Sequence, residues 1–372
     1  MTEQQLVLER GAKTAGFRLT VGGTDLSAPV GTGQTLLQAA LRQGIKIPHL
    51  CLVGECGSCR CRLRGGKVRL KSDISHHVDH DALRQGYLLA CQSEALSDVD
   101  LAVPGLTPDA SGHGLTVTGA RIVSARALNH DIRHLVLELD RPIAYRAGQY
   151  AQLNVPGHPV LAEAPRCYSF CTAPEAQAQR EVSFHVRRVP GGAFTDWLWA
   201  EDRAGQRLEL TGPLGDFAFH DDQRPMVCVA GGSGLAPIKA ILEQLCAQPS
   251  APDVTLFFAA RAQQDLYCLA EIARLQADWP GPGRLLLEPV LSQEPADSDW
   301  RGLTGYCGEH LASFCSPAES SFYLCGPPAM IDSILGHLDG KVAAQHVHYD
   351  RFLDRSTLTQ TSTTTDQQKV HA

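Results

Sequence analysis

The sequence predicts a multidomain chain of mixed α+β and α/β class that ends in a doubly wound parallel sheet. Three observations predict it. Four cysteines gather around a glycine-rich loop near the N-terminus; residues 116–222 alternate apolar and smaller or polar side chains between Gly and Pro turns; and from residue 223 apolar strands alternate with helical stretches. A chain of 372 residues has room for two or three domains. We expect domains over 1–107, 115–222 and 223–353, a linker over 108–114 and a disordered Thr/Ser-rich tail over 354–372.

The glycine-rich loop is the strongest chemical signal in the sequence. Cys51, Cys56 and Cys59 follow the C-x4-C-x2-C spacing of a plant-type [2Fe–2S] loop, and Cys91 supplies a distant fourth thiolate. Small residues such as Gly54 let the backbone amides turn toward the sulfurs. The sequence therefore predicts a [2Fe–2S] centre on these four cysteines.

Two other interpretations of these cysteines are a zinc site and a set of inert buried thiols. Zinc sites usually pair two short C-x2-C spacings, whereas here the fourth cysteine stands alone. Cys61 has no role in the spacing, so we interpret it as structural.

Short strands and one helix surround the loop. Residues 17–30 read as two strands around a Gly22-Gly23 turn, Thr35 and Gln38 fit a capping box for a helix that stops at Gly44, and residues 67–71 and 81–85 read as a strand and a short helix. This order resembles the β-grasp of plant-type ferredoxins over about residues 15–105.

Composition and charge exclude several classes. The chain has no run of eighteen apolar residues and no signal-peptide pattern, so we expect no membrane span. Thirteen cysteines, mostly scattered among apolar residues, suit reduced thiols in a cytoplasm. The net charge of −7 and the absence of an aromatic-plus-basic motif argue against nucleic acid as a partner. A local basic run follows the loop and reads either as a solvated strand face or as a docking patch for an acidic redox partner: Arg60, Arg62, Arg64, Lys67, Arg69 and Lys71.

Residues 116–222 predict a small antiparallel barrel with two anion-binding features. Arg166-Cys-Tyr-Ser169 ends one β segment, and Pro190-Gly-Gly-Ala-Phe-Thr195 opens a helix. A guanidinium and free helix N-terminal amides suit a pyrophosphate, while Tyr168 and Ser169 could contact a flavin ring. Arg-x-Tyr-Ser alone is a weak pattern; followed by the Gly-Gly turn and a nucleotide domain it becomes strong.

The last region alternates strands and helices. We expect strands over 226–230, 254–259, 285–291 and 321–325, and helices over 238–248 and 266–277. Gly231-Gly-Ser-Gly234 follows the first strand and is a phosphate-binding turn in the expected place, although a turn without a ligand is the simpler alternative. Pro237 is consistent with the start of a helix either way.

The order of these motifs resembles the ferredoxin–NAD(P)H reductase family, and within it the reductase components of bacterial multicomponent oxygenases, closest to those serving Rieske-type aromatic-ring dioxygenases. The resemblance covers residues 15–353. It implies FAD on Arg166, Tyr168 and Ser169, with the flavin pyrophosphate on Gly191, Gly192 and Thr195. It implies the nicotinamide dinucleotide on Gly232, Ser233, Gly234 and Pro237, and it sets Cys325, Gly326 and Pro327 beside the nicotinamide and Phe352 near the flavin. Cys167, where the family usually has proline, and the extension beyond Phe352 are departures.

The resemblance implies that electrons pass from NADH through FAD to the [2Fe–2S] cluster and on to a terminal oxygenase or its ferredoxin. Arg261 follows the second strand of the sheet, where a 2′-phosphate could sit, but Asp265 would repel that phosphate, so we expect NADH rather than NADPH. Two alternatives remain open. One is the same reductase serving a di-iron monooxygenase or a deoxysugar dehydratase, and the other is a non-catalytic iron–sulfur carrier or adaptor.

Overall fold

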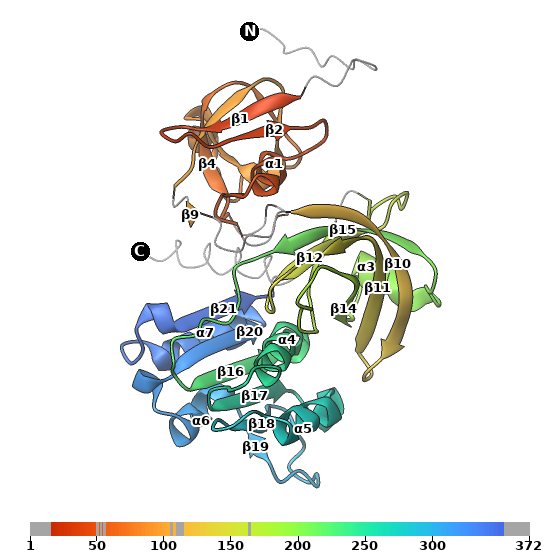
Figure 1. Ribbon diagram of the computed structural model, residues 1–372, viewed down its shortest axis with the longest axis vertical. Helices are drawn as coiled ribbons and strands as arrows, with labels where there is room; N and C mark the ends of the chain where they lie inside the picture. Colours follow the sequence, from red (N-terminus) through yellow and green to blue (C-terminus); the bar gives the residue numbers. More distant parts are fainter. Residues whose placement is uncertain are drawn as a thin grey trace, which may run out of the picture. The chain divides into compact units, whose positions relative to one another are not determined.

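The computed structural model describes residues 16–49, 52, 54, 57–104, 107–108, 115–162 and 165–352. The chain divides into two compact units, residues 1–115 and 116–372, and each is described by itself (Figure 1). The predicted tail, residues 354–372, and most of the predicted linker lie outside the described residues.

The first unit is a small mixed sheet with one main helix. Its five strands follow the order β2-β1-β8-β4-β6, with β1 and β8 parallel and the other pairs antiparallel. The strands are β1 (Phe17–Val21), β2 (Ser27–Val30), β4 (Arg60–Gly65), β6 (Tyr87–Leu89) and β8 (Val99–Ala102). Two-stranded sheets join β3 (Ile45–Lys46) to β9 (Thr107–Pro108) and β5 (Val68–Leu70) to β7 (Ser93–Ala95). This is the β-grasp arrangement that the sequence predicts.

Helix α1 (Leu36–Arg42) begins as its sequence indicates. The backbone N–H of Gln38 donates to the Thr35 hydroxyl at 3.2 Å, and the Thr35 N–H donates to the Gln38 side chain at 3.1 Å, so the capping box is confirmed. Gly44, at φ +69°, follows the helix end in the left-handed conformation that glycine adopts without strain. The second helix, α2, spans His80–Arg84.

The second unit starts with the predicted antiparallel barrel. Its strands follow the order β13-β12-β15-β10-β11-β14: β10 (Thr116–Ala127), β11 (Ile132–Ile143), β12 (Tyr150–Asn154), β13 (Arg166–Ser169), β14 (Gln179–Arg187) and β15 (Arg207–Leu214). A bridge between Phe170 and Phe184, together with the Cys171 N–H donating to the Ser183 carbonyl at 3.0 Å, connects the two end strands. The alternating apolar side chains of β11 and β14 fill the interior.

The rest of the second unit is an all-parallel sheet in the order β19-β18-β17-β16-β20-β21. The strands are β16 (Met226–Gly231), β17 (Val254–Ala260), β18 (Leu285–Leu291), β19 (Leu303–Thr304), β20 (Ser321–Gly326) and β21 (Val347–Arg351). Helices α4 (Leu235–Cys246) and α5 (Leu269–Ala277) pack on one face; α6 (Cys307–Phe314) and α7 (Pro328–Leu338) pack on the other. Helices on both faces make the sheet doubly wound, as predicted.

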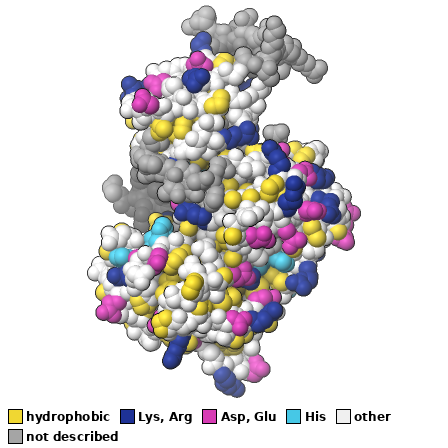
Figure 2. Space-filling model, in the orientation of Figure 1, with side chains coloured by type: hydrophobic (Ala, Val, Ile, Leu, Met, Phe, Trp, Pro, Cys, Tyr) yellow, Lys and Arg dark blue, Asp and Glu magenta, His cyan; other side chains and the backbone are white. Residues whose placement is uncertain are grey.

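Two predicted helix starts were wrong. Helix α4 begins at Leu235 rather than at residue 238, because Pro237 falls in the first turn, where its missing N–H would have no partner anyway. Helix α5 begins at Leu269 rather than at residue 266, because a 3₁₀ turn over Gln263–Asp265 and a left-handed Cys268 precede it. No described helix is long and apolar enough to cross a bilayer. On the face that Figure 2 shows, basic and acidic side chains are interspersed over the second unit.

Candidate functional site

Two of the four predicted cluster cysteines, Cys59 and Cys91, lie among the described residues, and the fold brings them together. Cys59 directly precedes β4, and Cys91 lies in a 3₁₀ turn (Ala90–Gln92) directly after β6, the strand that pairs with β4. The Cys91 N–H donates to the Cys59 Sγ at 3.5 Å. Residues 32 positions apart are thus adjacent, as four-thiolate ligation requires. Cys51 and Cys56 lie outside the described residues.

The described glycines of the loop support a tight turn. Gly54 and Gly57 have φ values of +90° and +71°. A Cβ on Gly54 would lie 2.8 Å from the Gln92 side chain, and one on Gly57 would lie 2.9 Å from the His77 ring. Larger residues would therefore push the loop away from these neighbours. This room and the two adjacent thiols fit a cluster held by cysteine.

Cys61 faces the opposite way from its neighbours on β4. It is fully buried, and burial together with nearby Cys59 raises the pKa of its thiol. A neutral thiol packed in the core fits the structural role that the sequence predicts.

The two predicted flavin motifs meet in the barrel. Arg166 to Ser169 form β13, the end strand of the sheet, with Ser169 buried opposite Tyr150 on β12. The Tyr168 ring lies 5.2 Å from that of Phe194 in α3 (Ala193–Ala200), the helix that the Gly191-Gly192 turn opens. Motifs more than twenty residues apart are therefore neighbours. Cys167, the departure from the family pattern, is exposed.

The turn before α3 depends on its two glycines and on Thr195. Gly191 has φ +72°, and a Cβ on Gly192 would lie 2.7 Å from the Thr195 hydroxyl oxygen. The Thr195 hydroxyl is 2.9 Å from the Val189 carbonyl and accepts the Val189 N–H at 3.2 Å. Thr195 thus holds the turn in shape at the start of α3.

A pocket of about 470 Å³ opens at the predicted dinucleotide turn. Gly232, Arg261 and Pro327 line it; Ser233, Gly234 and Pro237 do not. Gly234 is nevertheless required, because a Cβ there would collide with the Cys325 carbonyl. The Tyr267 hydroxyl donates a hydrogen bond to the Gly232 carbonyl at 3.0 Å and so holds the turn in place.

Arg187 is a pocket residue that the sequence analysis missed. It ends β14 of the barrel, and its Nη1 atom would be 3.5 Å from a Cβ on Gly232, so the guanidinium lies over the dinucleotide turn. Its Nε donates to Asp131 at 3.0 Å, which fixes the side chain. The signal in the sequence was a cation just before the Gly191-Gly192 turn, but only the fold brings that strand to the other domain.

An ion pair between a buried lysine and a half-buried glutamate also joins the barrel to the parallel sheet. Lys239 and Glu243 on α4 form an ion pair. The Lys239 Nζ donates to the Cys171 carbonyl at 3.2 Å, and Glu243 accepts the Ala173 N–H at 2.9 Å. Because each partner also bonds the barrel backbone, the pair fixes how α4 sits on the barrel.

The predicted C-terminal site residues are grouped at the ends of β20 and β21. Cys325 is fully buried and paired in register with Asp350, and the Phe352 N–H donates to the Gly326 carbonyl at 2.9 Å. Phe352 is half-buried against the core cluster that contains Cys325. Asp350 was not anticipated from the sequence, although it stands only two residues before Phe352.

Asp350 leads to a pH prediction. Burial raises the pKa of its carboxyl from 3.8 to about 7, so the folded protein keeps a proton that the unfolded chain releases. The wild type therefore loses free energy of unfolding through this group as pH rises from about 4 to about 7. An asparagine side chain cannot titrate, so the free energy of unfolding of Asp350→Asn, relative to that of the wild type, should increase between pH 5 and pH 7. The increase is at most about 3 kcal/mol, at ~1.4 kcal/mol per pH unit. Denaturant unfolding at both pH values measures the gain, and a constant difference would contradict it.

Comparison with known proteins assigns the chain to a family. Three family models match it in order: a 2Fe-2S iron-sulfur cluster binding domain over residues 19–96, an oxidoreductase FAD-binding domain over 119–219 and an oxidoreductase NAD-binding domain over 228–335. The electron transfer component of xylene/toluene monooxygenase from Pseudomonas putida is 40% identical over 91% of this chain and 94% of its own. The chain belongs to the ferredoxin–NAD(P)⁺ reductase family of electron-transfer components.

Other members carry different names. The reductase subunit of an aromatic O-demethylase from Amycolatopsis is 35% identical over 91% of this chain and 99% of its own, and the reductase component of the naphthalene 1,2-dioxygenase system from Pseudomonas putida is 32% identical over 87% and 95%. Among solved structures, the Amycolatopsis cytochrome P450 reductase matches with a TM-score of 0.78 and 33% identity, over 90% of this chain and 98% of its own. The ferredoxin reductase of carbazole 1,9a-dioxygenase matches with a TM-score of 0.79 and 28% identity, over 92% and 100%. This reductase therefore has the family's FAD, NAD and 2Fe–2S domains.

Proposed function

We propose that the reductase takes a hydride from NADH and delivers single electrons to a separate oxygenase, or to the ferredoxin of one. The observation that carries the proposal is the presence of all three cofactor domains on one chain, with the dinucleotide pocket bordered by the flavin barrel. Bound FAD would accept the hydride's two electrons together, and the cluster would pass them on singly.

The chain's own residues bind and align the cofactors in this proposal. Arg166 and the first amides of α3 hold the FAD pyrophosphate, while Tyr168 and Ser169 contact the flavin ring. Gly232 and Arg187 face the dinucleotide pyrophosphate from the two sides of the pocket. Cys325 and Phe352 shape the place where nicotinamide meets flavin. Thr195 and Pro237 support the two turns rather than touching the cofactors.

The acceptor is proposed from the names of relatives. Those names include a monooxygenase, an O-demethylase and a dioxygenase system, each acting on aromatic compounds. We therefore propose an aromatic-compound oxygenase in the cytoplasm, Rieske-type or not, as the electron acceptor. A deoxysugar dehydratase has no support among these relatives, and membership of an oxidoreductase family sets aside the non-catalytic carrier.

Cofactor content tests the proposal at its base. Purified reductase should contain one FAD, two irons and two acid-labile sulfides per chain, because one motif set for each group is present. Metal analysis, sulfide assay and the visible spectrum measure these quantities. Zinc, or iron without labile sulfide, would contradict the cluster assignment.

The nucleotide preference gives a second prediction. Arg261 is exposed at the pocket and lies 3.7 Å from Asp265 in an ion pair. Asp265 also accepts the Ala262 N–H at 2.9 Å, so its carboxylate is fixed where a 2′-phosphate would approach Arg261. We expect kcat/KM for NADH to exceed that for NADPH by about tenfold or more, a difference of ~1.4 kcal/mol. Asp265→Asn should lower the ratio of kcat/KM for NADH to kcat/KM for NADPH, because the carboxylate that repels the 2′-phosphate is gone. Equal or better use of NADPH by the wild type would refute this preference.

A further inference from the structure

The outer face of the sheet in the first unit carries a concentrated positive charge. Arg60, Arg62 and Arg64 alternate with Cys61 and Leu63 along β4, and all three arginines are exposed. Arg18 on β1 lies on the same face of the sheet. Among the described residues of the five strands, Asp100 on β8 is the single acidic residue, and it lies on this face too. The basic face is defined here as Arg18, Arg60, Arg62 and Arg64.

Not all of the basic run in the sequence contributes to this charge. Arg64 is 3.6 Å from Asp100, and Arg69 and Lys71 both pair with Glu94. Arg60 and Arg62 form no ion pair with any residue that the structure describes. Arg64, Arg69 and Lys71 therefore have their charge balanced by an acid within the unit. Lys67 and Arg18 also form no ion pair among the described residues, but Arg60 and Arg62 are the two unpaired cations on β4 itself.

These two arginines are held in place by an aromatic ring. The Arg60 guanidinium carbon lies 4.6 Å from the centre of the Tyr87 ring and that of Arg62 lies 5.9 Å from it. The Arg62 Nε also donates to the Gln85 carbonyl at 2.8 Å. Side chains that are already ordered lose less entropy on binding, and Arg with Tyr is the composition typical of interface hot spots. Binding a partner would therefore cost these side chains little.

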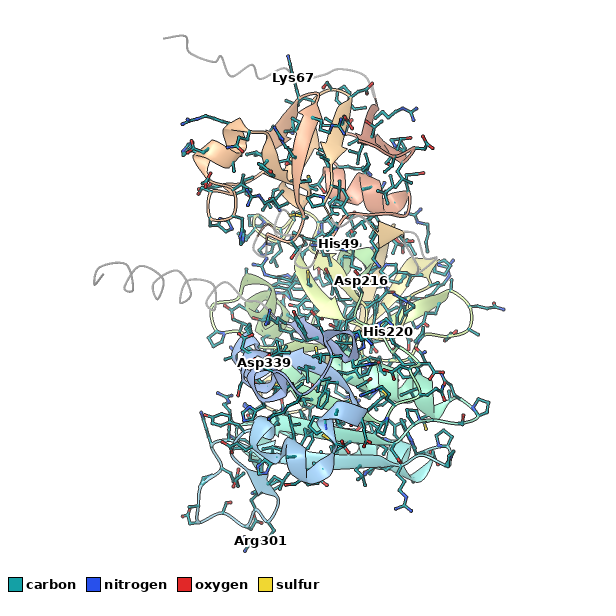
Figure 3. All side chains as sticks on the ribbon, turned by 90° about the vertical axis from the view of Figure 1, so that its left-hand side faces the viewer. His49, Lys67, Asp216, His220, Arg301 and Asp339 are labelled. Atoms are coloured by element: carbon teal, nitrogen blue, oxygen red, sulfur yellow. The ribbon has the colours of Figure 1, made fainter. Side chains whose placement is uncertain are left out.

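The position of the pair links it to the cluster. Arg60 directly follows Cys59 and pairs across the sheet with Leu89, two residues before Cys91. Lys67, beyond the other end of β4, lies at the opposite end of the unit from His49, which precedes the cysteine loop (Figure 3). Arg60 thus marks the cluster end of the basic face.

We propose that the basic face, centred on Arg60 and Arg62, is the docking surface for an acidic electron-acceptor protein. The inference rests on the proposed function and names the charge of its partner. A carboxylate-rich surface would pair with the unpaired guanidinium groups of Arg60 and Arg62 and be steered toward the cluster end of the sheet. A bound cluster would supply one electron at a time: its oxidation by one electron would balance the one-electron reduction of the acceptor's metal, with no proton transferred.

The test uses the full-length holoprotein and two redox probes of opposite charge: the acidic soluble domain of cytochrome b5 and basic cytochrome c. The variant Arg60→Glu/Arg62→Glu is compared with Arg274→Glu/Arg301→Glu, which changes the net charge equally on exposed residues of the second unit. NADH-driven reduction of each probe, and direct binding of oxidised cytochrome b5 to oxidised reductase, are measured at low and high salt.

We expect the face variant to lose about tenfold or more in cytochrome b5 binding and reduction at low salt, with the loss shrinking as salt screens the charges. The control variant should keep both the binding and the reduction of cytochrome b5, and cytochrome c reduction should not fall in the face variant.

Unchanged cytochrome b5 binding in the face variant, or an equal loss of binding in the control variant, would overturn the proposal. So would slower cluster reduction by NADH in the face variant, because the face would then serve the chain's own flavin unit. A wild-type cluster that NADH cannot reduce would instead refute the proposed function, and the binding measurement would still decide the docking surface.

Discussion

Replacing Cys59 or Cys91 by alanine should abolish the cluster and electron delivery to protein acceptors, yet leave NADH reduction of the flavin intact. The two sulfurs are neighbours, since the Cys91 N–H reaches the Cys59 Sγ, and removal of either leaves three thiolates for a cluster that needs four. Flavin reduction should survive because the barrel and parallel sheet belong to a separate compact unit with its own cores. Cys51→Ala and Cys56→Ala should behave alike, although both positions lie outside the described residues.

Cys61→Ala is the matched control. Cys61 is as close in sequence to the loop but faces the core, so the variant should keep two irons and two sulfides per chain. In all five variants, iron and sulfide assays measure the cluster content. NADH–ferricyanide activity, which needs only the flavin, measures whether the flavin is still reduced. Retention of the full cluster in Cys59→Ala or Cys91→Ala would disprove the ligand assignment.

Ser169→Ala and Cys325→Ala should each slow flavin reduction at saturating NADH by about tenfold or more, roughly 1.4 kcal/mol. Hydride transfer needs the donor and acceptor atoms near contact, and small displacements are costly. Ser169 is buried at the end of β13, and Cys325 is the penultimate residue of β20, where the Gly234 turn packs against its carbonyl. FAD should stay bound in both variants, because Arg166 and the turn before α3 are untouched.

The competing account of Cys325 is purely structural. Its side chain is fully buried within a core cluster and lies outside the lining of the dinucleotide pocket, so truncation could cost stability alone. Stopped-flow reduction and melting temperatures of the two variants separate the accounts. An unchanged rate in both variants, with a lower Tm for Cys325→Ala, would remove these residues from the active site.

The sequence predicts features that depend on local chemistry. The cysteine spacing, the Thr35 capping box and the glycine turns before α3 and α4 are each specified by a few adjacent residues, because backbone conformation and capping are local. The alternation along β11 and β14 likewise predicts which side chains fill the barrel. Local patterns specify the order in which strands pair only in part, because the partner strands are distant in sequence.

What sequence reasoning missed depends on residues far apart in the chain. Arg187 ends a barrel strand and gains its place only because β14 runs to the Gly232 turn. Tyr267, in the loop after β17, donates a hydrogen bond to that same turn. The pKa of the Asp350 carboxyl is raised only because the fold buries β21 beside β20. Helices α6 and α7 were not anticipated because a Gly-rich start and a Pro-Pro start hide their periodicity. No local pattern contains these contacts.

Low-temperature electron paramagnetic resonance of the anaerobic wild-type reductase, frozen after mixing with excess NADH, tests the electron path most directly. The oxidised cluster is silent, whereas a one-electron-reduced [2Fe–2S] cluster gives a signal, so the path from NADH through FAD predicts that signal together with a bleached flavin. The Cys91→Ala variant should show the bleached flavin without the signal. A wild-type protein whose flavin bleaches while its cluster stays silent would contradict the account.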